Sequence, residues 1–320
     1  MTPTLPRRAV LTGAASLCAS AILAPTIGRA APALNVSYVL RPFNLPQIVM
    51  RQRGLLERRL QPLGWDVAWR EITSGVLQVQ ALASGSLDIG AVMNPVSVIL
   101  ALANGHPMRI IGGFARNLKL VAILAMDPAI RTVADLKGRA VAGLKGAVPH
   151  ELLIKALQSA GMDIGDVTFL DMDLVSGYTA LMARRVDAAV LAADLILKAA
   201  RAGAHEVPTA PGLIQPVNIA CARAELVAER PDLIRLYRAA AEEAVATVAA
   251  DPEAAIKLGC EANGLDLADG HELYAWQTFI TRLTEADLES LQRDMQFLID
   301  VKLCPRPVDL RAAMFEAMAT

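Results

Sequence analysis

Three short polar turns, each between a predicted strand and a predicted helix, are the part of this sequence best suited to bind an anion. They are Ser74-Gly75, Asn94-Pro95 and Gly146-Ala147. The N–H groups in the first turn of a helix lack intrahelical partners, and the helix dipole has its positive end there. Each helix end contributes about 0.3–1 kcal/mol to an exposed anion, and up to ~2 kcal/mol when partly buried. We therefore expect these turns to receive a small anion.

Two cationic side chains and a histidine accompany the turns. Arg41 follows the first predicted strand, and a guanidinium can form paired hydrogen bonds to a carboxylate, sulfonate or phosphate. Lys145 opens the third turn, where Gly146 lets the backbone approach an oxyanion closely. His150 lies in the first turn of the helix that follows. The alternative is that Arg41 and Lys145 are solvated surface residues and that His150, like most lone histidines, is a surface or hinge residue.

The motifs of several enzyme classes are absent from the sequence. There is no G-x-G-x-x-G after a strand, no G-x-x-x-x-G-K-[ST] and no G-x-S-x-G. The four histidines are far apart and lack H-E-x-x-H spacing, and no two cysteines stand in a C-x-x-C pair. We therefore predict no catalytic residue, no metal site and no cofactor. Whether any two of Cys221, Cys260 and Cys304 form a disulfide is left open.

The first 31 residues have the features of an export signal and are excluded from the fold. Arg7-Arg8 precedes an apolar run at 14–27 that is too short to span a bilayer comfortably, and Gly28-Arg29-Ala30 fits a small-x-small cleavage site. We expect the mature chain to begin near Ala31 and to be periplasmic. The twin arginine favours the Tat route without excluding the Sec route. An N-terminal membrane anchor is the less favoured alternative.

Composition favours a large folded protein. The 320 residues are 54% hydrophobic and 20% charged, which suits a large core or two lobes rather than disorder. Without the three arginines of the signal, 28 basic residues remain against 32 acidic ones, a net charge near −4. No basic patch suits nucleic acid or anionic lipid, so neither is expected as a partner.

Strand and helix patterns alternate in two series, at 34–114 and at 132–203, with chain crossings near 115–117 and 208–216. From Ala224 the pattern is helical to the end. This order predicts an α/β fold of two lobes, each a mostly parallel sheet flanked by helices, joined by a two-strand hinge. Lobe 1 is assigned residues 32–116 plus 217–320, lobe 2 residues 117–216, and the signal residues 1–31.

Five segments, in this order, resemble periplasmic solute-binding proteins of ABC importers: LLERRLQPLGWDVAWREITSG, ALASGSLDIG, ADLKGRAVAGLKGAVPHELLIKALQSAGM, RRVDAAVLAAD and ARAELVAERPDLI. The resemblance is greatest to the aliphatic sulfonate, taurine and nitrate group, which is related to proteins that bind a thiamine pyrimidine precursor. It implies the type II periplasmic-binding-protein fold, with the ligand held between two lobes. It also implies a monomer that performs no catalysis and delivers its ligand to an inner-membrane permease with a separate ATPase.

The resemblance implies which residues of this chain contact the ligand. By matching position they are Arg41, Asn44, Ser74, Gly75, Asn94, Lys145, Ala147, His150 and Asp194. The sulfonate-binding members usually have Trp-Asp-Pro where this chain has Ala192-Ala193-Asp194, and Arg184-Arg185 replaces a usual glycine. The substrate is therefore expected to differ from a simple alkanesulfonate. Asp194 either pairs with an amine of the ligand or caps its helix, and the cap is the preferred interpretation.

These features predict a capture protein that binds a sulfonate-, taurine- or nitrate-like anion and closes around it by a hinge motion. Two alternatives stay open. One is a thiamine-pyrimidine-precursor binding or synthesis protein on the same fold, although synthesis would need a His- and Cys-rich iron site that the scattered cysteines do not suggest. The other is a periplasmic sensor that passes its signal to a membrane receptor.

Overall fold

Two β-sheets organise the residues that this computed structural model describes, namely 31–41, 43–72, 74–117, 119, 121–210, 212–214 and 216–315. The predicted export signal lies outside them except for Ala31. The residues from Pro32 onward form a unit of their own. No helix within the described ranges is long and apolar enough to cross a membrane.

The first sheet has six strands in the order β11-β4-β10-β3-β1-β2. They are β1 (Ala33–Tyr38), β2 (Asp66–Glu71), β3 (Ile89–Met93), β4 (Met108–Asn117), β10 (Val217–Arg223) and β11 (Gln277–Phe279). β1 pairs in parallel with β2 and β3, whereas β10 runs antiparallel to β3 and β4. All residues of β3 are buried, as in a strand covered on both faces. Because β1, β2 and β3 are parallel, their carboxyl ends lie at one edge of the sheet.

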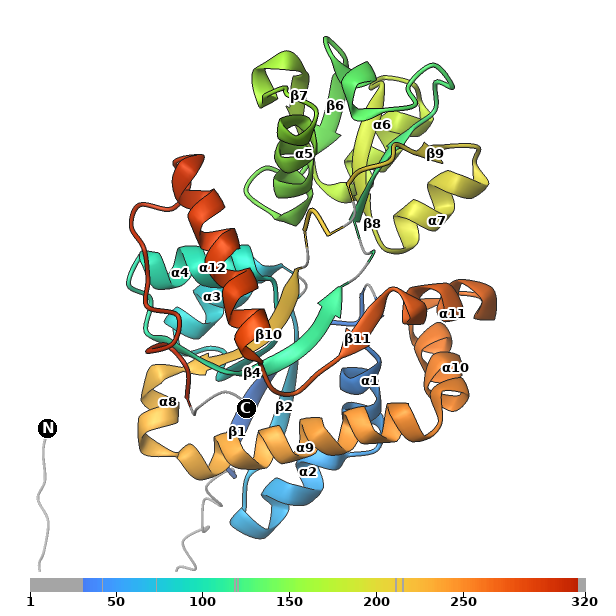
Figure 1. The fold of residues 1–320 in the computed structure, drawn as a ribbon. Helices are drawn as coiled ribbons and strands as arrows, with labels where there is room; N and C mark the ends of the chain where they lie inside the picture. Colours follow the sequence, from blue (N-terminus) through green and yellow to red (C-terminus); the bar gives the residue numbers. More distant parts are fainter. Residues whose placement is uncertain are drawn as a thin grey trace, which may run out of the picture. The chain divides into compact units, whose positions relative to one another are not determined.

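Helices connect or follow the strands of the first sheet (Figure 1). They are α1 (Leu45–Gln52), α2 (Leu55–Leu60), α3 (Gly75–Ala83), α4 (Pro95–Ala103), α8 (Ala224–Glu229), α9 (Pro231–Ala250), α10 (Pro252–Asn263), α11 (Leu267–Ala275) and α12 (Glu285–Asp300), with the 3-10 turn η1 (Gln61–Leu63). The pattern at 45–60 predicts one helix, but the chain breaks into α1 and α2 at Gly54, whose φ of 59° is left-handed. The helical pattern after Ala224 also misses β11, which pairs antiparallel with β4. Three residues are too few to show a strand alternation.

The second sheet has five strands in the order β7-β6-β8-β5-β9. Its strands are β5 (Val121–Ala125), β6 (Ala140–Gly143), β7 (Thr168–Asp171), β8 (Ala188–Ala192) and β9 (His205–Glu206), and its helices are α5 (Val148–Ser159), α6 (Leu174–Met182) and α7 (Asp194–Arg201), with the 3-10 turns η2 (Val133–Leu136) and η3 (Ile164–Asp166). β6 pairs in parallel with β7 and β8, whereas β5 is antiparallel to β8 and β9. The predicted α/β class is confirmed. Both sheets are mixed rather than mostly parallel, because β5, β9, β10 and β11 run against their neighbours.

The chain passes from the first sheet to the second after β4 and returns before β10, and these two strands are antiparallel neighbours (Figure 1). The first sheet takes its strands from 33–117 and 217–279, and the second takes its strands from 121–206. This division supports the lobe boundaries given above, which we retain as a proposal.

One hydrophobic cluster joins α5 to α12. Val148 and Ile154 of α5 lie in the same buried cluster as Leu291, Phe297 and Leu298 of α12. At the end of β4, Arg116 forms a bidentate ion pair with Asp287 of α12, with N–O distances of 2.6 and 2.7 Å. The last long helix is therefore fixed both to a crossing strand and to a helix of the second sheet.

Candidate functional site

The first two polar turns meet at the amino ends of α3 and α4. Ser74 Oγ accepts a hydrogen bond from Leu77 N at 3.5 Å, and Asn94 Oδ1 accepts one from Ser97 N at 2.9 Å. A Cβ at Gly75 would lie 2.5 Å from Asn94 Nδ2 and 2.6 Å from Ser97 Oγ. Any larger residue would therefore displace the Asn94 and Ser97 side chains, and glycine leaves them in place. The structure thus brings Ser74, Gly75 and Asn94 together.

A buried polar network links α3, which follows the first of these turns, to β1 and β3. Ser37 Oγ in β1 donates to Gln78 Oε1 in α3 at 2.9 Å and accepts from Ala91 N in β3 at 2.8 Å. Gln78 Nε2 donates to Val92 O at 3.0 Å. Sequence analysis did not single out this pair. The local signal is a polar residue on a buried face of the strand and of the helix.

Asn44 shapes the loop that carries Arg41. Its Nδ2 donates to Val39 O at 2.6 Å and to Arg41 O at 3.0 Å, and the side chain is buried. Gln47, which sequence analysis also missed, accepts from Val39 N at 2.7 Å and donates to Ser37 O at 2.6 Å. Both amides are thus engaged with the backbone, and among the described residues of this loop, 39–41 and 43–44, Arg41 is the exposed one.

Side chains from β7 and α5 accept hydrogen bonds from the backbone of the third turn. Lys145 N donates to Asp171 Oδ1 at 3.0 Å, and Gly146 N donates to His150 Nδ1 at 3.3 Å. The His150 ring lies over Phe169 with a centroid distance of 4.9 Å. Burial, followed by the nearby Lys145 charge, lowers the pKa of His150, so the imidazole remains neutral and its Nδ1 can accept.

Two N–H groups that an anion would use at the third turn are therefore occupied within the protein. Ala147 is the N-cap of α5, and no side chain caps that helix. His150 is buried rather than at the surface, and its Nδ1 holds the loop in place.

Arg41 and Asp194 join the two sheets. β6, β7 and β8 are parallel, so Asp194, which follows β8, lies at the carboxyl edge of the second sheet, as Arg41 does in the first. Arg41 Nη1 donates to Asp194 Oδ2 at 3.2 Å, and Lys198 Nζ donates to the same oxygen at 2.8 Å. The helix-cap interpretation of Asp194 is wrong, because Ala193 is the N-cap of α7 and Asp194 is the first helical residue.

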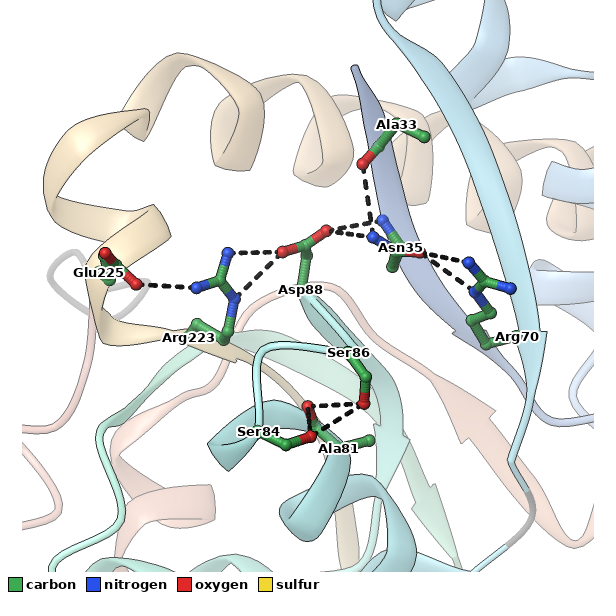
Figure 2. Close-up of polar contacts among 9 residues, drawn as sticks. All are labelled: Ala33, Asn35, Arg70, Ala81, Ser84, Ser86, Asp88, Arg223 and Glu225. Carbon is green, nitrogen blue, oxygen red and sulfur yellow. Dashed lines mark hydrogen bonds and ion pairs between the residues drawn. The ribbon is translucent and has the colours of Figure 1, made fainter. Parts of the chain in front are cut away.

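A second polar cluster, at the amino end of β3, is separate from this site. Figure 2 shows Asp88 between Arg223 and Asn35, with Arg70 and Glu225 at the two ends. Arg223 donates twice to Asp88 Oδ1, at 2.7 and 3.1 Å. Asp88 Oδ2 accepts from Asn35 N at 2.8 Å and from Asn35 Nδ2 at 3.0 Å. These contacts tie β1, β2, β3 and β10 together at the end opposite to the turn that follows β3.

A family model described as NMT1/THI5 like matches residues 61–255, more than half of the chain. The chain belongs to this family. The matched range contains the three polar turns and Asp194, and it begins after Arg41. A putative binding protein of Brucella abortus (strain 2308) is 28% identical over 226 residues, which cover 69% of this chain and 68% of the relative.

Two solved structures show how widely this fold is used. The periplasmic aliphatic sulphonate-binding protein SsuA from Escherichia coli matches with a TM-score of 0.78 and 24% identity, over 89% of this chain and 97% of that one. The desulfurization enzyme DSZB matches with a TM-score of 0.69 and 16% identity, over 88% and 96%. The periplasmic-binding-protein fold and the family resemblance predicted from the sequence are confirmed. The fold alone does not separate capture from catalysis.

The described residues contain no group of three or more His, Cys, Asp or Glu side chains that could hold a metal ion. Cys221, Cys260 and Cys304 are buried and free. Burial raises the pKa of the Cys221 and Cys260 thiols, which disfavours the thiolate that a nucleophile or metal ligand requires.

Proposed function

We propose that this chain is the substrate-capture protein of an ABC importer. It binds a small organic anion in the periplasm and delivers it to an inner-membrane permease driven by a separate ATPase. It acts as a monomer without catalysis, and it reaches the periplasm through a cleaved signal at residues 1–31. Family membership and the likeness to a sulphonate-binding protein support this proposal.

The Arg41–Asp194 contact is the observation that carries it. The contact joins the carboxyl edge of the first sheet to that of the second, and ligands of open α/β sheets bind at such edges. The amino ends of α3 and α4 lie at the same edge of the first sheet as Arg41. An anion placed there would have N–H donors from two helix ends and the guanidinium of Arg41.

Apolar side chains beside the first turn favour an organic tail on the anion. Val76 and Leu77 follow Gly75 in the first turn of α3, and they are 58% and 54% exposed. Covering them with a hydrocarbon tail would remove apolar surface from water, at about 25 cal/mol per Å². A sulfonate or carboxylate that carries an apolar tail therefore fits this site better than nitrate, which has no tail.

A ligand panel followed by thermal unfolding tests the proposal. The panel holds taurine, longer alkanesulfonates, aromatic sulfonates, carboxylates, nitrate and a hydroxymethylpyrimidine. A ligand present at 100 times its dissociation constant should stabilise the protein by roughly 2.7 kcal/mol. We expect organic monoanions to raise the melting temperature. A panel in which only the hydroxymethylpyrimidine acts would point to the thiamine-precursor alternative, and a panel in which nothing acts would refute anion capture.

A further inference from the structure

Three charged side chains form a cluster where the two sheets meet. Asp194 Oδ2 accepts hydrogen bonds from Arg41 Nη1 at 3.2 Å and from Lys198 Nζ at 2.8 Å. The side chains of Arg41 and Lys198 are 61% and 44% exposed, whereas that of Asp194 is only 10% exposed. A buried negative charge thus lies between two cations that solvent reaches, and the three groups together carry a net charge of +1.

Arg41 can accept a ligand without releasing Asp194. The contact between them uses Nη1 alone, whereas a guanidinium carries five N–H donors in a planar fork. The high exposure of the Arg41 side chain leaves room for a second acceptor. A bound oxyanion would then share the guanidinium with the carboxylate.

The backbone and Lys198 hold Asp194 in this place. Ala193, the buried residue before it, has φ 52° and ψ −127°, a conformation that is strained for a residue with a Cβ. Lys198 lies one helical turn later in α7 and contacts the same carboxylate oxygen as Arg41. Asp194 therefore remains beside Arg41 when a ligand arrives, and its charge adds to the field that the ligand meets.

We infer that Asp194 makes the site selective for monoanionic head groups, such as sulfonate, over dianionic head groups, such as a phosphate monoester. This inference rests on the proposed function. A monoanion brings the cluster with Arg41 and Lys198 to zero net charge. A dianion leaves a net charge of −1 next to a carboxylate that solvent screens poorly, and like charges at short range repel more strongly where the effective dielectric is low.

A purely structural role for Asp194 makes a different prediction. If the carboxylate only tied Arg41 to α7, its removal would change the affinity for monoanions and dianions by the same factor. If the charge of Asp194 repels the second negative charge of a dianion, its removal changes the ratio of the two affinities. The test therefore compares ratios, which also cancels any general effect of pH or of the substitution on the fold.

The experiment uses 1-butanesulfonate and butyl phosphate, two probes with the same tail. The sulfonate is a monoanion throughout, whereas a phosphate monoester passes from monoanion to dianion near its second pKa of about 6. Dissociation constants are measured calorimetrically at about pH 5 and pH 8. The proteins are the wild type, Asp194→Asn, Lys198→Gln, and the control Glu206→Gln, which removes an exposed carboxylate from β9 of the same sheet.

For the wild type, the ratio of the phosphate to the sulfonate dissociation constant should rise by about tenfold or more between the two pH values. In Asp194→Asn the rise should shrink to about threefold or less, in Lys198→Gln it should exceed that of the wild type, and in Glu206→Gln it should match the wild type. An equal rise in wild type and Asp194→Asn, with both probes bound, would overturn this inference while leaving anion capture intact. Binding of neither probe to any variant would refute the proposed function, and this inference with it.

Discussion

Asp294 on α12 and Lys155 on α5 face each other across the junction between the two sheets, with Asp294 Oδ1 3.9 Å from Lys155 Nζ. Lys155 Nζ also lies 2.5 Å from Glu151 Oε1, one turn earlier in α5. Both carboxyl groups are buried among the apolar residues that α5 and α12 share. Two buried acids thus share one ammonium. Burial, followed by the charge of Glu151, raises the pKa of Asp294 from its ordinary 3.8 to about 8, against the opposing charges of Lys155 and Arg293.

This acid pair predicts that stability falls as the pH rises. Because the folded-state pKa of Asp294 is raised, its stabilising contribution is complete below about pH 4 and is lost as the pH rises through about 8. Asp294→Asn cannot lose that proton. We expect its free energy of unfolding to exceed that of the wild type at pH 8 by on the order of a few kcal/mol, and to converge with it near pH 4.

Urea unfolding at several pH values measures this difference. The control is Asp300→Asn, an exposed acid at the end of the same helix. A wild type and Asp294→Asn that lose stability in parallel from pH 4 to pH 8 would contradict the assignment of the buried proton to this pair.

Gly75→Ala should disturb the meeting of α3 and α4. The added Cβ would stand 2.5 Å from Asn94 Nδ2 and 2.6 Å from Ser97 Oγ, so these side chains must shift and loosen the cap of α4, at a cost of about 1–3 kcal/mol. We also expect about a tenfold loss of affinity for the tightest-binding organic anion of the panel, because the loosened cap no longer fixes the N–H donors of α4. Gly177→Ala in α6 is the control, since its Cβ would meet Ala142 at an ordinary 3.6 Å and helix propensity favours alanine. Unchanged stability and binding in Gly75→Ala would show that the close approach is unimportant.

Ala193→Gly should stabilise the protein. Glycine adopts the φ of 52° without the strain that costs a residue with a Cβ about 1–3 kcal/mol. The greater freedom of glycine in the unfolded chain offsets about 0.5–1 kcal/mol, so a net gain of roughly 1 kcal/mol is expected. Ala192→Gly, in β8 just before, lacks that strain and should only destabilise. Chemical denaturation of both variants decides the matter, and a loss of stability in Ala193→Gly would mean that the backbone there is relaxed.

His150→Phe should keep the ring contact of this histidine and remove its hydrogen bond. A phenyl ring can still lie over Phe169, but it leaves Gly146 N–H without its acceptor, at a cost of about 1–3 kcal/mol. In the wild type, the lowered pKa of His150 means that stability falls as the pH drops below the ordinary 6.5 of histidine, because the unfolded chain protonates first. This loss of stability at acid pH should be absent from His150→Phe. Identical pH profiles for the two proteins between about pH 7 and 5 would exclude this role.

The sequence predicted those parts of the site that depend on local pattern. A strand, a polar residue and an apolar helix follow one another at Ser74 and at Asn94, and such a local order is enough to place an N-cap. The α/β class follows from the repeated alternation of strands and helices in the same way. β11 was missed because three residues carry no period, and its pairing with β4 depends on tertiary contacts.

Relationships between distant residues could not be predicted from one sequence. Arg41 and Asp194 are 153 positions apart, and nothing near either one indicates the other. The third turn was expected to offer free N–H groups, but His150 Nδ1 accepts one of them, which depends on how the imidazole packs against Phe169. Asn44 was assigned to the ligand from resemblance, and its amide instead donates to backbone oxygens.

The most direct test of anion capture is a calorimetric titration of the tightest-binding organic anion of the panel into the wild type, Arg41→Ala and Arg58→Ala. Arg58 is a matched control, because both arginine side chains are exposed and paired with a carboxylate. The Arg58 side chain is 58% exposed, with Nη2 3.3 Å from Glu243 Oε1, and that of Arg41 is 61% exposed, with Nη1 3.2 Å from Asp194 Oδ2. We predict one site per chain, at least about a tenfold weaker affinity in Arg41→Ala, and no change in Arg58→Ala. Equal affinities in the wild type and Arg41→Ala would contradict the account, because the anion would then bind away from the junction of the two sheets.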